Sequence, residues 1–290
     1  MKTITTLTLI WILGLASFAG EAMRSTDTAT VELMETPSGV KFGLRGLKTK
    51  SPLPLLLNFA GEFNESLTEE SLAGACEALV TNGWRVASLD LPSHGEEIRK
   101  GETPGLPGWR ERMEKGEDPM IEFCKRGSAV LDHLVKTGLA DSERIGALGI
   151  SRGGFAALHL AASDRRIRWV VAVAPLTRLT VPVEFANMQE NKIIQKLSVF
   201  NCVEKLVGRS VWLCIGNHDR RVGTEETVEF SRALVATNLA HKVPADVELH
   251  VYSYDGHTSK IENFQTAAIW LSAHAAMTSD DKSEEKGAMP

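Results

Sequence analysis

The sequence predicts an α/β protein, a three-layer αβα sandwich around a mostly parallel sheet of roughly eight strands. Short apolar runs, typical of buried parallel strands, alternate with segments of helical periodicity along most of the chain. Neither a repeat period nor a linker interrupts this alternation, so residues 20–278 are predicted to form one domain. Hydrophobic residues make up 43% and charged residues 24% of the 290 residues, which is enough apolar material for a core.

Eight segments have the composition of strands. Two opening strands precede a continuous apolar run, and five further strands follow at spacings that leave room for helical crossovers. The eight predicted strands are 31–35, 40–47, 54–59, 84–89, 144–150, 167–174, 211–215 and 247–254.

Amphipathic segments with helix start and stop signals lie between these strands. The predicted helices are 68–82, 119–137, 152–163, 225–239 and 259–277. Segment 95–118 is rich in Gly, Pro and charge and predicts an exposed excursion. Segment 176–207 predicts an irregular, partly helical insertion at the place where a lid would form.

The two ends of the chain differ from this body. A single early lysine precedes an apolar block at 9–16, and small residues follow at Ser17 and Ala19, spaced as signal peptidase requires. Residues 1–19 are therefore predicted to be a signal peptide that exports the protein to the periplasm or the medium. An uncleaved membrane anchor and a start at Met23 are the alternatives. The charged segment 279–290 predicts a disordered tail.

Charge and cysteine content narrow the classes of partner. The net charge of −5 and the pI near 5.9 lack the basic footprint of nucleic-acid binding. No two of the four cysteines form a CxxC pair, which argues against a zinc knuckle or a disulfide framework and favours buried free thiols. The four are Cys76, Cys124, Cys202 and Cys214.

The strongest chemical signal is Gly149-Ile150-Ser151-Arg152-Gly153, followed by Gly154. A G-x-S-x-G motif between a buried strand and a helix is typical of a nucleophile elbow, where the glycines leave room for a sharp turn. Ser151 is then the nucleophile. The backbone N–H of Arg152, at the start of the helix, is predicted to hold the developing oxyanion.

A nucleophilic serine needs a base and an orienting carboxylate, and in this kind of fold they follow at later strand ends. His257 is the one histidine on a loop that follows a strand and lies beside a glycine, so it is the predicted base. Asp219, just past strand 211–215, is the predicted acid. Asp255 is the rival, although two residues are too few for its carboxylate to reach the far ring nitrogen of His257.

The second oxyanion donor is expected on the loop after strand 54–59. Gly61 permits a tight turn there, and the Glu62 N–H is the predicted donor, with the Phe63 N–H as the alternative.

With Ser151, Asp219 and His257 in these positions, the chain resembles the α/β-hydrolase superfamily over about residues 30–278. Within the superfamily it is most similar to the dienelactone-hydrolase and prolyl-oligopeptidase-like esterases. The segments 90–95 and 216–222 add to the resemblance. Two positions depart from it, because many members have His-Gly where this chain has Ala60-Gly61, and glycine where it has Ser93. The resemblance implies a serine hydrolase, without room for the β-propeller of prolyl oligopeptidases.

The predicted reaction is hydrolysis of a carboxylic ester through an acyl-enzyme, on a small-molecule substrate and with no metal or organic cofactor. A small peptidase or amidase on the same triad is the alternative, and a non-catalytic binding protein is a third. Oligomeric state and substrate identity stay open.

Three sets of residues are candidates for specificity. Arg220 and Arg221 flank the acid and either bind a substrate carboxylate or cap their turn. The excursion either forms a solvated loop or a rim for an anionic substrate, and the insertion supplies either core or an acyl pocket. The residues concerned are Trp109, Arg110, Arg112 and Lys115, and Phe185, Met188, Ile193, Ile194, Leu197 and Phe200.

Overall fold

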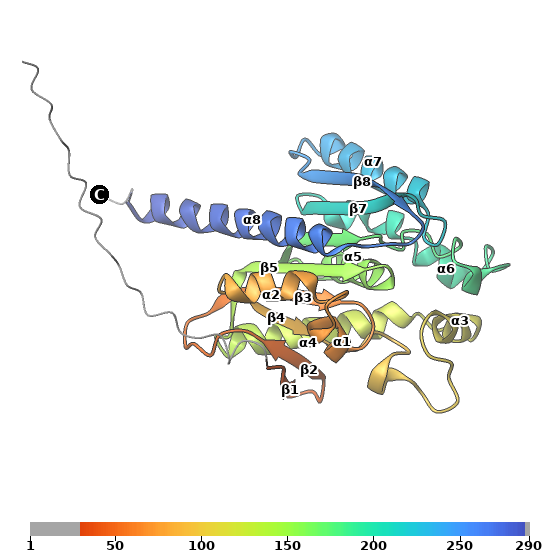
Figure 1. Cartoon of the computed structure of the whole chain (residues 1–290), viewed down its shortest axis with the longest axis horizontal. Coiled ribbons are helices and arrows are strands. Elements are labelled where there is room, and N and C mark those ends of the chain that lie inside the picture. Colours follow the sequence, from red (N-terminus) through yellow and green to blue (C-terminus); the bar gives the residue numbers. More distant parts are fainter. Residues whose placement is uncertain (1–29, 288–290) are drawn as a thin grey trace, which may run out of the picture.

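A computed structural model describes the backbone of residues 30–287 and the side chains up to residue 277 (Figure 1). Its centre is an eight-stranded sheet in the order β1-β2-β4-β3-β5-β6-β7-β8. The strands are β1 (Glu32–Glu35), β2 (Lys41–Arg45), β3 (Leu53–Phe59), β4 (Arg85–Ser88), β5 (Ala140–Ile150), β6 (Ile167–Val173), β7 (Ser210–His218) and β8 (Val247–Asp255). Only the β1–β2 and β2–β4 pairs are antiparallel, which confirms the mostly parallel sheet.

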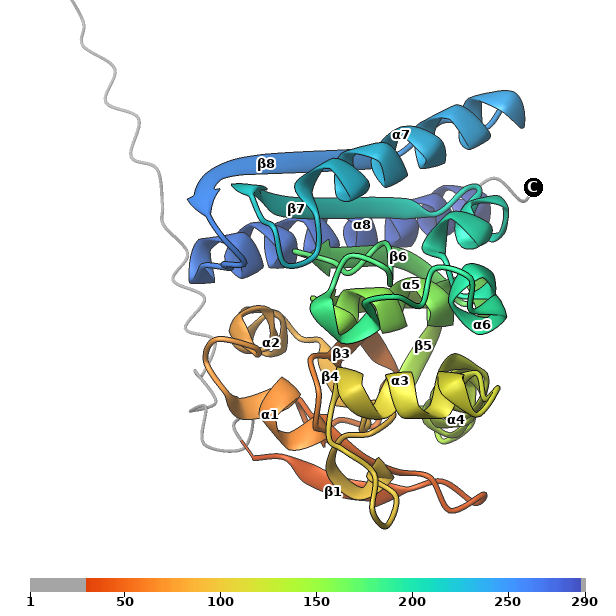
Figure 2. The ribbon, with the colours of Figure 1, turned by 90° about the vertical axis from the view of Figure 1, so that its right-hand side faces the viewer.

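Helices cover both faces of this sheet, as the sequence predicts; Figure 2 shows α5 in front of it and α8 behind it. The helices are α1 (Phe63–Thr68), α2 (Gly74–Thr81), α3 (Leu106–Glu114), α4 (Pro119–Lys136), α5 (Arg152–Ser163), α6 (Lys192–Lys196), α7 (Thr224–Ala240) and α8 (Ile261–Gly287). Alternate strand residues enter different cores. Leu55 and Leu57 of β3 pack with α4 and α5, whereas Leu56 packs with α2 and α8. The three-layer sandwich is therefore confirmed.

The insertion between β6 and β7 contributes to the core. It contains the short helices η2 (Val183–Phe185) and η3 (Val199–Leu206) as well as α6. The six apolar side chains that the sequence singled out in it are buried in the main core or pack against it, so core packing, rather than an acyl pocket, describes them. Those fully in the core are Phe185, Met188, Ile194 and Leu197, and those packed against it are Ile193 and Phe200.

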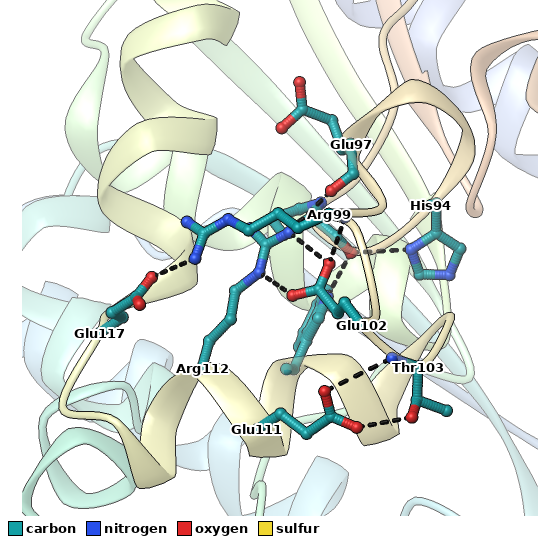
Figure 3. A network of polar contacts seen from close by, with 10 residues as sticks. His94, Glu97, Arg99, Glu102, Thr103, Glu111, Arg112 and Glu117 are labelled. Atoms are coloured by element: carbon teal, nitrogen blue, oxygen red, sulfur yellow. Dashed lines mark hydrogen bonds and ion pairs between the residues drawn. The ribbon is translucent and has the colours of Figure 1, made fainter.

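The excursion is more ordered than predicted. It contains η1 (Gly95–Glu97) and α3, and Trp109 is fully buried with its indole N–H donating to the Pro92 carbonyl at 2.5 Å. Arg112 forms a two-point ion pair with Glu102, and each side chain is only 7% exposed. Figure 3 shows this network of polar contacts. A predicted loop is thus a packed element, because its charges neutralise one another and its tryptophan enters the core.

Two helix boundaries also differ from the prediction. The expected helix 68–82 is two helices, because α1 ends at Thr68 and α2 begins only at Gly74. At the other end, α8 continues through residues 279–287, where the sequence predicts disorder. Glu and Lys in this segment favour helix, and the packed first part of α8 supplies the nucleus that an isolated helix lacks. Figure 1 shows this end of α8 projecting beyond the sheet.

The predicted signal peptide lies outside the described residues. Within residues 30–287, no helix combines the length and hydropathy needed to cross a membrane. All four cysteines are free thiols, and three of them are buried.

Candidate active site

Ser151 occupies a sharp turn between β5 and α5. Its backbone has φ +55° and ψ −117°, in the region that a residue with a side chain adopts only under strain. Hydrogen bonds fix the turn, since the Ser151 N–H donates to the Val173 carbonyl at 2.9 Å and the Leu176 N–H donates to the Ser151 carbonyl at 3.0 Å. Ser151 therefore lies in the elbow geometry that the motif predicts.

The glycines around Ser151 are required by space. A Cβ on Gly149 would overlap the Gly153 carbonyl, and a Cβ on Gly153 would overlap the Phe59 carbonyl at the end of β3. The second contact brings the start of α5 against the loop that follows β3. The elbow glycines thus hold the nucleophile beside the expected oxyanion loop.

Asp219 lies in the turn after β7, and its carboxylate is completely buried. One oxygen, Oδ1, accepts the backbone N–H groups of Arg221 at 2.9 Å and Val222 at 3.2 Å. The other, Oδ2, lies 2.7 Å from His257 Nδ1. Burial raises the pKa of Asp219, but the hydrogen bond and charge of His257, with the two backbone donors, outweigh it and hold this pKa below its usual range.

His257 reaches this carboxylate from the loop after β8. The Gly256 N–H donates to the His218 carbonyl at 3.1 Å, which joins the histidine loop to the end of β7. The rival acid, Asp255, is exposed and forms no hydrogen bond with His257. Since β5, β7 and β8 are parallel strands of one sheet, Ser151, Asp219 and His257 all lie at its carboxyl edge.

The backbone N–H groups of the loop after β3 differ in whether they already donate a hydrogen bond. The Ala60 N–H donates to Ser66 Oγ at 3.0 Å, and the Phe63 N–H donates to Asp90 Oδ1 at 2.8 Å. The Gly61 and Glu62 N–H groups donate to no group in the described chain, and the same holds for the Arg152 N–H at the start of α5. The geometry thus favours Glu62 over Phe63 as the second oxyanion donor, because Phe63 is already engaged.

Sequence reasoning missed His94 and the side chain of Arg152. A Cβ on Gly61 would lie 3.0 Å from His94 Cδ2 and 3.3 Å from Arg152 Nη2, so both groups line the oxyanion loop. Figure 3 shows His94 at the edge of the polar network, where its Nδ1 lies 2.9 Å from the Pro92 carbonyl. Burial, and then the charge of Arg152, lower the pKa of His94 to about 4, so the ring is neutral.

The segment that contains His94 supported the family resemblance, but nothing in the pattern indicated that its histidine would be buried. His94 is 8% exposed, and its Nε2 finds no hydrogen-bond partner among the described residues.

Of the two arginines beside Asp219, Arg221 is held in an ion pair. Arg221 forms a two-point ion pair with Glu184 of the insertion, with both N···O distances 2.5 Å. Arg110 of α3 donates to the Glu184 carbonyl at 2.9 Å. These contacts tie the insertion to the excursion and to the turn of Asp219. Arg220 is exposed.

The fold and the site together indicate a class of enzyme, and comparison with known proteins gives the family. A strained serine elbow at the centre of a mostly parallel sheet, with an Asp–His pair at later strand ends, defines a serine hydrolase of the α/β-hydrolase fold. The sequence profile of the prolyl oligopeptidase family matches residues 127–278, just over half of the chain. The chain therefore belongs to the prolyl oligopeptidase family. A search of curated proteins found no significant match.

Solved structures share the fold at low identity. A putative dipeptidyl aminopeptidase IV from Bacteroides ovatus is 15% identical with a TM-score of 0.66, over 84% of this chain but 35% of its own. TT1662 from Thermus thermophilus is 20% identical with a TM-score of 0.64, over 85% of this chain and 98% of its own. The esterase Pf2001 from Pyrococcus furiosus is 21% identical with a TM-score of 0.57, over 85% and 90%. The chain thus spans about a third of the first protein and most of the other two.

Proposed function

We propose that this protein hydrolyses carboxylic esters with Ser151 as nucleophile, His257 as base and Asp219 as the orienting acid. The observation that carries the proposal is the 2.7 Å contact between His257 Nδ1 and the buried carboxylate of Asp219, at the sheet edge where Ser151 occupies its strained turn. With Nδ1–H donated to Asp219, the Nε2 of the neutral ring is a free base for the Ser151 proton.

The reaction follows from these positions. His257 Nε2 takes the hydroxyl proton as Ser151 Oγ attacks the ester carbonyl. The N–H groups of Arg152 and Glu62 then hold the carbonyl oxygen, which becomes negative. His257 returns the proton to the departing alcohol, and an acyl-enzyme remains. The same base then removes a proton from water, which attacks the acyl-enzyme and releases the acid.

Ester substrates are supported by the extent of the likeness to known structures. The Pyrococcus furiosus esterase is matched over 90% of its length, whereas the Bacteroides ovatus dipeptidyl aminopeptidase is matched over 35%. The family itself favours a second candidate function, cleavage of short peptides on the same triad.

Two measurements test these proposals. A fluorophosphonate probe should label the protein, and Ser151→Ala should abolish labelling and turnover, a loss on the order of 10⁶ in kcat. The change removes one hydroxyl from a strained turn, so the melting temperature of this variant should not fall. A labelled protein that cleaves aminoacyl-p-nitroanilides faster than p-nitrophenyl esters would be a peptidase, and an unlabelled protein would contradict the triad.

We also propose export through the predicted signal peptide, supported by the apolar block and the small residues that end at Ala19. N-terminal sequencing of the exported protein should give Gly20 as the first residue. A sequence that starts at Met1 or Met23 would contradict cleavage at this site.

A further inference from the structure

Arg152 is a partly buried cation without a counter-ion. Its Nε is inaccessible and lacks a hydrogen-bond partner, and its guanidinium forms no ion pair with any described residue. Burial is the largest influence on this group and lowers its pKa. A guanidinium keeps its charge in proteins, so the positive charge stays at the site without an internal partner.

Arg152 differs in this respect from Arg221, in the turn of the acid, and from Arg112 of α3. Arg221 is neutralised by Glu184 through two contacts, and Arg112 by Glu102. Glu65 and Glu184 act on Arg152 only through their fields, since neither forms an ion pair with it. Leaving a partly buried charge without an ion-pair partner costs free energy, and an anion that enters the site would recover part of it.

The position of the guanidinium indicates which part of a substrate it would meet. Arg152 Nη2 lies over Gly61, the residue before Glu62, and next to His94. This is the β3–β4 side of Ser151, whereas His257 lies on the β7–β8 side. His257 must protonate the leaving alcohol, so the alcohol faces β8. The acyl part is the portion of the substrate that can extend away from the alcohol, past the oxyanion donors and toward Arg152.

We propose that the Arg152 guanidinium binds a carboxylate on the acyl part of the substrate, so that the preferred substrates are monoesters of dicarboxylic acids. His94 is not the anion-binding group, because its ring is neutral and its Nε2 can only accept a hydrogen bond, so the guanidinium is the group that would hold the carboxylate. This inference rests on the proposed ester hydrolysis and names the substrate class of the same site.

Paired substrates test the proposal. Mono-p-nitrophenyl adipate and p-nitrophenyl hexanoate have the same chain length and leaving group and differ by the terminal carboxylate. The wild-type protein should prefer the adipate ester in kcat/KM by about 10- to 100-fold, the range of a hydrogen bond to a charged group. Arg152→Gln should lose this preference, and Arg152→Lys should keep part of it. Arg220→Gln, which removes an exposed charge near the triad, should leave the preference unchanged.

The outcomes separate this proposal from the proposed function. Equal rates on both esters in a protein that a fluorophosphonate labels would overturn the carboxylate site and leave the triad intact. Equal loss on both esters in Arg152→Gln would mean that the guanidinium acts on the reacting oxygen instead. If Arg152→Gln fails to fold, inhibition of the wild-type protein decides the matter. Free adipate should inhibit the hydrolysis of p-nitrophenyl hexanoate more strongly than free hexanoate does. Equal inhibition by the two acids would overturn the carboxylate site.

Discussion

The two sides of Ser151 differ in how their polar groups are satisfied. On the β7–β8 side, the carboxylate of Asp219 accepts three hydrogen bonds, two from backbone and one from His257. On the β3–β4 side, the Glu62 N–H, the Arg152 guanidinium and His94 Nε2 have no partner among the described residues. The difference teaches that the chain alone orients the imidazole of His257, whereas it leaves the polar groups of the opposite wall available to solvent or to a bound group.

Of the two sides, the satisfied one should give the larger effect when it is disrupted. Asp219→Asn keeps the shape of the side chain but favours the wrong tautomer of His257, so kcat/KM should fall on the order of 10³–10⁴. Asp255→Asn is the matched control and should lose less than about tenfold. Both variants are measured on one activated ester across neutral pH. A larger loss in Asp255→Asn would move the acid to the histidine loop.

The next effect should come from the unsatisfied side. Glu62 has φ −77°, which proline also adopts, so Glu62→Pro removes the free N–H with little change in the backbone. The loss of one oxyanion donor should lower kcat by about 10²–10³. Glu62→Ala keeps the N–H and should retain activity. Full activity in a folded Glu62→Pro variant would show that the donor lies elsewhere.

A smaller effect concerns His94 and the pH dependence of the free energy of unfolding. Because burial lowers the pKa of His94 to about 4, the unfolded chain takes up its proton first, and stability is lost as pH falls from about 6.5 toward about 4. This histidine alone should cost about 2 kcal/mol between pH 7 and about pH 5.

Urea unfolding at the two pH values measures this loss. His94→Asn should reduce it by about that amount. Burial also lowers the pKa of His159 to about 4. The variant His159→Gln therefore serves as a second reference for the loss of stability at acid pH. An unchanged acid sensitivity in His94→Asn would mean that the ring is not neutral in the folded state.

The smallest effect concerns Ser93, beside His94. Ser93 has φ +59°, and its buried hydroxyl has no hydrogen-bond partner among the described residues. Ser93→Gly removes the strain and the unpaired hydroxyl, so the free energy of unfolding should rise by about 0.5–1 kcal/mol after the entropy cost of glycine. Chemical denaturation measures it. A loss of stability would show that the hydroxyl makes a contact that offsets the strain.

The residues on the satisfied side could be located from the sequence. The glycines between an apolar strand and a helix predict Ser151 as the nucleophile, and each of these signals lies within a few residues of it. Asp219 follows a continuous apolar run and His257 follows a strand of alternating apolar and polar residues, and parallel strands bring their ends to one edge. The choice of Asp219 over Asp255 needed only the reach of a carboxylate around an imidazole, and the structure has the hydrogen bond at Asp219.

The unsatisfied side depended on packing between distant segments. A basic residue after the serine does not reveal whether a carboxylate will meet it, and only the folded chain gives Arg112 and Arg221 their partners and leaves Arg152 without one. The burial of Trp109 was likewise hidden in the segment 95–118, which is rich in Gly, Pro and charge, and His94 directly precedes this segment. The sequence by itself determined the succession of strands and helices along the chain and the chemistry of the nucleophile, because turn and strand preferences act between near neighbours. Tertiary structure decided which charges are neutralised, because burial and pairing depend on residues that meet only when the sheet has formed.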